Sequence, residues 1–178
     1  MNTVQWGRTH TLKCKTMNKF EKIIIVSAGK SNYYTDTLDE SVGLQQVLRL
    51  IPAVGEAVSN EKNVITWSSA LSSNQSTAAY IQQRLGVPCT TEPLLGGSKT
   101  VQRETLGAFL SMRHRAIESD ATAIIVVIEK SYVNQLIRII FKEISCAAPE
   151  FTTIEDGEVI VLNIRYGTFK KIWSNPPS

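Results

Sequence analysis

The residues best suited to chemistry lie directly after two apolar segments of the chain. Ser27 and Lys30 follow the run Ile-Ile-Ile-Val, and Glu129 and Lys130 follow the run Ala-Ile-Ile-Val-Val-Ile. Uninterrupted apolar runs of this kind are typical of strands that are covered on both faces of an α/β sheet. Ligands of α/β proteins usually bind just beyond the carboxyl ends of such strands. We therefore expect these four residues to border the functional site.

Three lysines favour a site for an anion. Lys30 and Lys130 follow the two apolar segments, and Lys99 lies on a Gly-Gly loop. Together with backbone N–H groups at nearby helix N-termini, these side chains predict weak binding of phosphate or sulfate. The alternative is that Lys30 or Lys130 pairs with Glu129, which would leave a site that binds no anion.

The composition is that of an ordinary globular protein. The 178 residues favour a single domain, and 43% of them are hydrophobic and 20% charged. A net charge of +3 is too small to indicate nucleic-acid binding. No apolar run approaches the roughly 20 residues of a membrane-spanning helix, so membrane association is not expected. We expect residues 17–178 to form the domain and the polar residues 1–16 to be a loosely ordered extension.

Cysteine and histidine are scarce. Cys14, Cys89 and Cys146 show neither close pairing nor the spacing of metal ligands, which favours reduced thiols in a cytoplasmic protein. The two histidines are His10 and His114, so a histidine-based metal site is not expected. No cofactor is predicted.

Strand-like segments alternate with segments of helical periodicity along the chain. This alternation predicts an α/β fold, a three-layer α/β/α sandwich with a mostly parallel sheet. The last two strand-like segments flank a turn at residues 165–167, which indicates a C-terminal β-hairpin and therefore an antiparallel pair at one edge. The expected strands are residues 23–26, 63–67, 123–128, 158–164 and 168–173.

Local signals place the ends of the expected helices. The first begins after a cap at Asp39 or Ser41, and Pro52 ends or kinks it. Another begins near Ser73 and ends at Gly86, and residues 88–99 form a loop. A third opens at Thr100, and Ser131 caps the last.

Short motifs at the ends of these elements follow the order of a known family. The chain has four of them: Ser27-Ala28-Gly29, Ser68-Ser69-Ala70-Leu71, Thr77-Ala78 and Ile128-Glu129-Lys130. In this order and spacing, the segment from about Lys22 to Trp173 resembles the histidine phosphatase superfamily. The resemblance implies the phosphoglycerate-mutase-like fold, in a family that hydrolyses or transfers phosphoryl groups.

The chain departs from the family at the catalytic positions. The family's Arg-His-Gly, whose histidine is the nucleophile, corresponds to Ser27, Ala28 and Gly29, so only the glycine is kept. Ser73 stands in place of an arginine, and Glu129 in place of the second histidine. Ala28 has no nucleophilic atom, and a carboxylate repels a phosphoryl group that needs cationic donors.

The resemblance therefore implies a protein without the family's chemistry and with no catalytic residue. We expect a binding or regulatory role towards a phosphorylated small molecule or a protein partner, and the sequence leaves a homo-oligomer open. The family's proton-donating glutamate has only Glu92 as a nearby counterpart. His114 lies in a charged run typical of a solvated helix face, so it is not expected to replace the nucleophile.

Two alternatives remain: the protein is an active enzyme, or it binds a nucleotide. In the first, the protein is an active phosphatase or phosphomutase with a rearranged site in which Glu129 is the acid–base group. In the second, Gly29-Lys30-Ser31 binds a nucleotide as the end of a P-loop does. The P-loop pattern requires a glycine five residues before Gly29, but that position is Ile24 within the strand.

Overall fold

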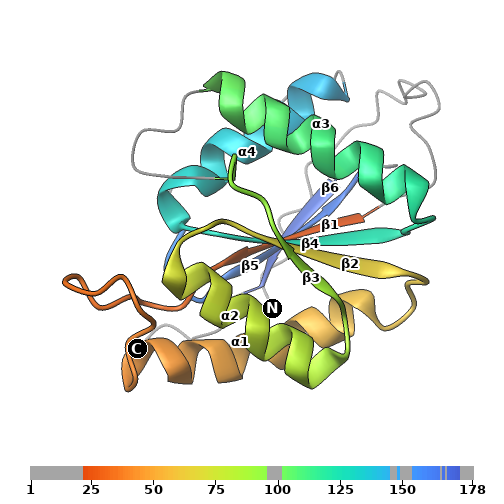
Figure 1. Cartoon of the computed structure of the whole chain (residues 1–178). Coiled ribbons are helices and arrows are strands. Elements are labelled where there is room, and N and C mark those ends of the chain that lie inside the picture. Colours follow the sequence, from red (N-terminus) through yellow and green to blue (C-terminus); the bar gives the residue numbers. More distant parts are fainter. Residues whose placement is uncertain are drawn as a thin grey trace.

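The described part of the computed structural model comprises residues 22–95, 102–144, 148, 154–164, 166 and 168–172. Its elements, labelled in Figure 1, are β1 (Lys22–Ser27), α1 (Val42–Val58), β2 (Val64–Ser68), α2 (Ser72–Leu85), β3 (Cys89–Thr91), α3 (Gln102–Glu118), β4 (Ala123–Ile128), α4 (Lys130–Glu143), β5 (Val159–Asn163) and β6 (Thr168–Ile172). The predicted extension, residues 1–16, lies outside the described residues, so the proposed division of the chain stays a prediction.

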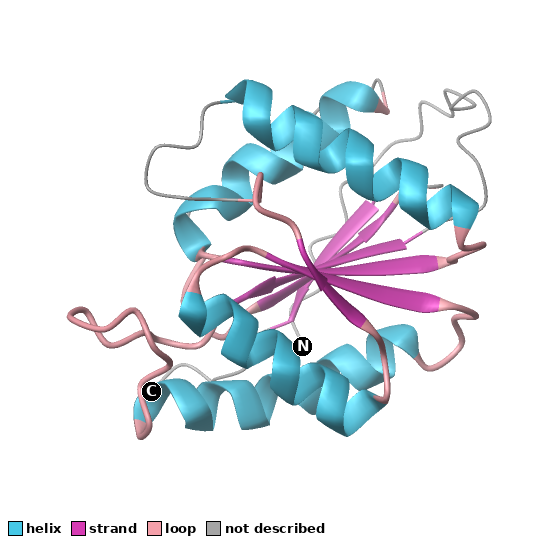
Figure 2. Cartoon of the chain, in the orientation of Figure 1, coloured by secondary structure: helices cyan, strands magenta, loops and turns pink. Residues whose placement is uncertain are grey.

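One sheet forms the middle layer of the fold. Its strand order is β3-β2-β4-β1-β5-β6, in which the first four strands are parallel. β1 and β5 pair antiparallel, as do β5 and β6. Figures 1 and 2 show α1 and α2 on one face of the sheet and α3 and α4 on the other. The predicted α/β/α sandwich, with its mostly parallel sheet and C-terminal hairpin, is confirmed.

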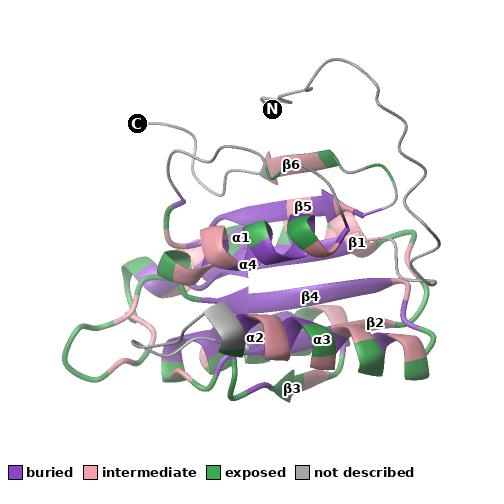
Figure 3. Cartoon of the chain, turned by 90° about the horizontal axis from the view of Figure 1, so that it is seen from above, coloured by how far each residue is buried: buried purple, intermediate pink, exposed green. Residues whose placement is uncertain are grey.

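The central strands are buried on both faces. In β1, Ile23 and Ile25 belong to one core cluster, whereas Ile24 and Val26 belong to the other. Every residue of β4 is buried, and Figure 3 shows β4 in the colour of buried residues and β5 in that colour over most of its length. Because helices cover both faces, neither set of alternating side chains meets water, and this explains the uninterrupted apolar runs in the sequence.

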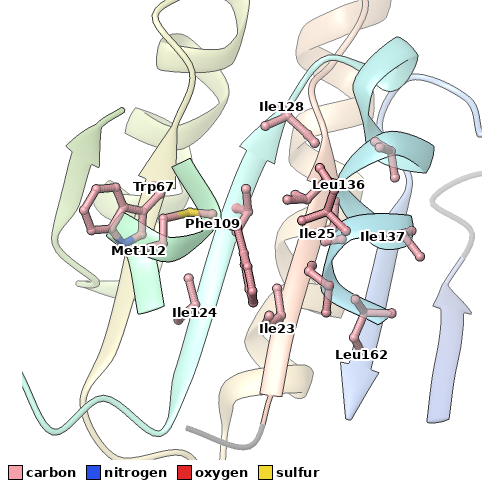
Figure 4. Packing of buried hydrophobic residues seen from close by; sticks show 14 of the residues in the cluster. Ile23, Ile25, Trp67, Phe109, Met112, Ile124, Ile128, Leu136, Ile137 and Leu162 are labelled. Carbon is pink, nitrogen blue, oxygen red and sulfur yellow. The ribbon is translucent and has the colours of Figure 1, made fainter. Parts of the chain in front are cut away.

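The larger core cluster lies between the sheet and the helices α3 and α4. Figure 4 shows Met112 of α3 near Trp67 of β2, Phe109 of α3 between β4 and β1, and Leu136 of α4 beside Ile25 of β1. All five side chains are at most 2% exposed. Burial of each stabilises the fold by about 1.5–3 kcal/mol, and this packing fixes the carboxyl ends of β1, β2 and β4 relative to one another.

Of the two alternatives for Pro52, an end of the helix is excluded, because α1 continues through the proline to Val58. The predicted cap of the last helix is wrong. α4 begins at Lys130 with Glu129 as its N-cap residue, so Ser131 lies within the first turn and does not cap the helix.

Around α2, one prediction is confirmed and one is wrong. α2 ends before Gly86, whose φ of 68° is the left-handed conformation expected of a terminating glycine. The expected loop 88–99 contains a short strand, β3, which pairs with β2. Its Thr90 and Thr91 are exposed, so this edge strand lacks the apolar pattern that marks the other strands.

No helix in the described ranges is both long and apolar enough to cross a membrane.

Candidate functional site

The predicted site positions meet at the carboxyl end of the sheet. The N–H of Ala28 donates to the carbonyl of Ile128 at 3.0 Å, which joins the ends of β1 and β4. The N–H of Gly29 donates to Oγ1 of Thr77 at 3.3 Å, and this hydroxyl donates to the carbonyl of Ser73 at 2.8 Å. The positions at which the chain departs from the family, on β1, on α2 and directly after β4, therefore lie side by side, as the family resemblance implies.

Gly29 packs tightly against the start of α1. A Cβ atom at this position would lie 2.6 Å from the carbonyl oxygen of Gly43, 2.8 Å from Cδ1 of Leu38 and 2.9 Å from Cγ2 of Val47. These distances are far below the ordinary carbon contact distance of about 3.5–4.0 Å. The one residue kept from the family's first motif is thus required by packing, with or without catalysis.

Ser27 and Ser73 are buried and not suited to act as nucleophiles. Ser27 is 1% exposed, and its hydroxyl makes no hydrogen bond within the described residues. Ser73 is 5% exposed. His114 lies far along α3, where its Nε2 is 3.3 Å from Oε1 of Glu118 and its side chain is 73% exposed. It is a solvated helix residue, as predicted, and gives neither serine a base.

Neither Cys89 nor a set of metal ligands replaces the missing histidines in the part of the chain that the structure describes. Burial raises the pKa of the Cys89 thiol, a shift that a hydrogen bond with Ser68 partly opposes. A thiol of raised pKa is a poor nucleophile at neutral pH. Across the described ranges, no three histidine, cysteine or acidic side chains gather as metal ligands do.

Of the predicted anion-binding lysines, Lys130 is already paired. Its Nζ lies 3.1 Å from Oδ2 of Asp156 and 3.7 Å from Oε2 of Glu155, and these acids, rather than Glu129, are its partners. Partial desolvation acts to lower the pKa of Lys130, but the hydrogen bond and charge of Asp156, aided by Glu155, outweigh it and raise this pKa above its ordinary value. The charge of Lys130 is thus balanced within the chain.

The other two lysines differ in their setting. Lys30 is exposed, and its backbone N–H donates to Oε1 of Gln46 at 2.8 Å. Lys99 lies outside the described residues. Their proposed contribution to anion binding stays a prediction.

The N-terminus of α1 carries a carboxylate from the chain itself. Oδ1 of Asp39 accepts hydrogen bonds from the N–H of Ser41 at 3.0 Å, from its hydroxyl at 2.8 Å and from the N–H of Val42 at 2.7 Å. These bonds, led by the one from the Ser41 hydroxyl, lower the pKa of Asp39. Of the two expected caps, Ser41 is the N-cap residue but its side chain makes no capping bond, whereas the side chain of Asp39 bonds the N–H of Val42.

The N-termini of α2 and α4 are matched by acidic residues as well. Oδ2 of Asp36 accepts a hydrogen bond from the N–H of Ser72, the first residue of α2, at 3.3 Å. Glu129 is the N-cap residue of α4. Sequence reasoning missed Asp36, because it reaches α2 from a loop 36 positions earlier and no local motif marks such a pairing.

Glu92 also lies at the carboxyl end of the sheet. It directly follows β3, and its N–H donates to the carbonyl of Ser68 at 2.8 Å. Its side chain is buried, accepts a hydrogen bond from the N–H of Leu94 at 3.2 Å and lies 3.5 Å from the hydroxyl of Ser111. The structure therefore places Glu92 beside β2, where its side chain is bonded to its own turn and lies next to α3.

Solved structures share this arrangement of elements. A mycobacterial glucosyl-3-phosphoglycerate phosphatase is similar over 85% of this chain and 97% of its own, with a TM-score of 0.62 and 10% identity. The putative phosphohistidine phosphatase SixA from Agrobacterium tumefaciens is similar over 85% and 95%, with a TM-score of 0.56 and 9% identity. The fold is that of the histidine phosphatases.

A third histidine-phosphatase structure, phosphoserine phosphatase from Entamoeba histolytica, is similar over 84% of this chain and 94% of its own, with a TM-score of 0.58 and 13% identity. No family model and no curated protein sequence matches this chain. At such low identity the likeness shows the fold alone. The phosphoglycerate-mutase-like fold implied by the sequence resemblance is confirmed, and the activity is a separate question.

Proposed function

We propose that this chain is a catalytically inactive protein of the histidine phosphatase fold that acts by binding a protein partner, in a regulatory role. The observation that carries the proposal is chemical. The nucleophile position is the methyl group of Ala28, the position of the clamping arginine on α2 is the buried Ser73, and the position of the second histidine is the exposed carboxylate of Glu129.

Phosphoryl transfer needs an attacking atom and cationic donors around the equatorial oxygens. Ala28 supplies no attacking atom, and the described cations at the carboxyl end are Lys130, which is paired with Asp156, and the exposed Lys30. Loss of one such group can cost several orders of magnitude in rate, and the losses act as a unit. This argues against the alternative in which Glu129 is the acid–base group of a rearranged site, since an acid–base group without a nucleophile leaves water alone to attack.

A phosphorylated ligand is also disfavoured relative to a protein partner. Helix N-termini are natural anion sites, but α1 has Asp39 at its N-terminus, α2 has Asp36 and α4 has Glu129. Lys130, the predicted phosphate ligand on α4, is paired with Asp156. A phosphate would have to displace the bonded carboxylates of Asp39 and Asp36 and, at α4, remain near the charge of Glu129, whose side chain makes no capping hydrogen bond.

The nucleotide alternative lacks its structural context. A P-loop passes directly into a helix after its lysine. Here Ser31 forms a β-bridge with Leu38, and α1 begins only at Val42. We therefore expect ATP to leave the melting temperature unchanged. The cytoplasmic location predicted from cysteine usage is part of the same proposal.

The test of lost catalysis is hydrolysis of p-nitrophenyl phosphate across acid and neutral pH. We expect no turnover above buffer for the wild type, for Glu129→Gln or for the matched surface variant Glu40→Gln. Turnover that Glu129→Gln abolishes and Glu40→Gln preserves would show an active, rearranged site and would overturn the proposal.

A further inference from the structure

Two tyrosines project from the loop between β1 and α1. We call residues 30–41 the tyrosine loop, and Figure 1 shows it extending outward from the carboxyl end of the sheet. Tyr33 is 94% exposed and Tyr34 is 92% exposed. Their rings contact each other edge to face, with centroids 5.6 Å apart and an interplanar angle of 85°. Neither ring packs on the core, so the fold does not account for them.

The tyrosine loop is held in place by hydrogen bonds of its own. Ser31 and Leu38 form a β-bridge across its base. The N–H of Asn32 donates to the carbonyl of Thr37 at 2.7 Å, and the N–H of Tyr34 donates to Oδ1 of Asn32 at 3.0 Å.

The tyrosine loop is also bonded to α2, because the N–H of Ser72 donates a hydrogen bond to the carboxylate of Asp36. Exposed aromatic rings on a loop that is already ordered can contact a partner at a low cost in conformational entropy. Tyrosine is also among the residue types that contribute most to binding at protein interfaces.

The described charges in the connections at the carboxyl end of the sheet, where the tyrosine loop lies, are mostly negative, opposite in sign to the net charge of the chain. Among the described residues of the connections after β1 and β4 and before β5, leaving aside the buried Glu158 and its partner Lys171, acidic side chains outnumber basic ones. The acids are Asp36, Asp39, Glu40, Glu129, Glu155 and Asp156, and the bases are Lys30 and Lys130. The chain as a whole carries +3. The described residues of these connections therefore favour a cationic partner over an anionic one.

We propose that the tyrosine loop and the acidic side chains around it bind a basic protein segment rich in arginine. The inference rests on the proposed function and names the class of its partner. A guanidinium group stacks favourably on the face of a tyrosine ring, while neighbouring carboxylates attract its charge. Nucleic acids and anionic membrane surfaces carry the wrong sign for this face.

The test is fluorescence anisotropy with a labelled peptide of alternating arginine and glycine, and with the matching glutamate–glycine peptide. We expect the arginine peptide to bind at low salt and weaken as salt rises, and the glutamate peptide not to bind. Tyr33→Ala/Tyr34→Ala should weaken binding by about tenfold, whereas Tyr33→Phe/Tyr34→Phe should preserve it because the rings remain.

Tyr166→Ala is the matched control, since Tyr166 is also exposed, at 67%, but lies in the β5–β6 turn at the opposite end of the sheet. It should leave binding unchanged, and circular dichroism should show that all the variants are folded. Absence of arginine-peptide binding, equal loss in Tyr166→Ala, or preferential binding of a DNA oligonucleotide through Tyr33 and Tyr34 would overturn the inference. These results would overturn only the basic partner and would not bear on the loss of catalysis. Turnover of p-nitrophenyl phosphate, in contrast, would overturn the proposed function itself.

Discussion

The carboxylate of Asp36 accepts a hydrogen bond from the backbone N–H of Ser72, with 3.3 Å between Oδ2 and the nitrogen. Ser72 is the first residue of α2, so its N–H is one of the groups that a helix N-terminus leaves without a partner inside the helix. In a phosphate-binding site such a group faces the ligand. Here the chain supplies the anion itself.

The contact between Asp36 and Ser72 should contribute measurably to stability. Asp36→Asn removes the charge that faces the N-terminus of α2, and we expect the free energy of unfolding to fall by about 0.3–1 kcal/mol at low salt. Urea unfolding, with the loss shrinking at high salt, checks this. Glu40→Gln, an exposed acid on the same loop, is the control and should change stability less; an equal effect would count against a specific role of Asp36.

Asp39 should make the stability of the fold sensitive to acid. Because its pKa lies below the ordinary value of 3.8, the carboxylate stabilises the folded state above pH 3.8, and this contribution is lost as the pH falls through the lower folded-state pKa. Wild type should therefore be more stable than Asp39→Asn at neutral pH, and the difference should shrink in strong acid. Urea unfolding over this pH range measures it. A difference independent of pH would show that the charge of Asp39 is not involved.

Lys130 should lose its raised pKa when its main partner is neutralised. In Asp156→Asn the charge and the strongest hydrogen bond acceptor beside Lys130 are removed, so we expect its pKa to fall towards the ordinary value of 10.5. Titration of the Lys130 Nζ resonance by NMR checks this. Glu118→Gln, an acid that pairs with His114 on α3, should leave that titration unchanged. An unshifted pKa in Asp156→Asn would contradict the pairing seen in the structure.

Gly29 should tolerate no side chain. Gly29→Ala would push a Cβ atom to within 2.6 Å of the Gly43 carbonyl oxygen, and we expect a loss of about 1–3 kcal/mol in the free energy of unfolding. Gly107→Ala in α3 is the matched control, because its nearest neighbour is Cδ1 of Leu94 at an ordinary 3.6 Å. It should be neutral or stabilising by up to about 1 kcal/mol. Thermal or urea unfolding of both variants checks this, and a stable Gly29→Ala would refute the packing argument.

The layers of the fold could be predicted because their signals are local. An uninterrupted apolar run such as residues 123–128 indicates a strand that is buried on both faces, and Gly86 marks a helix end through its own backbone conformation. β3 could not be predicted in this way, since its three residues owe their strand geometry to pairing with β2. The start of α4 was misplaced because capping propensity favours Ser131, whereas the helix begins one residue after the buried strand β4.

The location of the site residues could be predicted from the sequence, but the hydrogen bonds and ion pairs between them could not. In the structure Ala28, Ser73 and Glu129 lie at one end of the sheet, each at or near the end of its own element. The pairings that decide its chemistry, Asp36 with α2 and Asp156 with Lys130, join residues 36 and 26 positions apart, and no local motif specifies them.

Calorimetric titration with inorganic phosphate tests the central claim most directly, because that claim concerns which charges occupy the carboxyl end of the sheet. The bonded carboxylates of Asp39 at α1 and Asp36 at α2, together with the negative charge of Glu129 at the start of α4, predict no heat of binding at millimolar phosphate for the wild type or for Lys30→Ala. Saturable heat in the wild type that disappears in Lys30→Ala would show a working anion site there and would contradict the account.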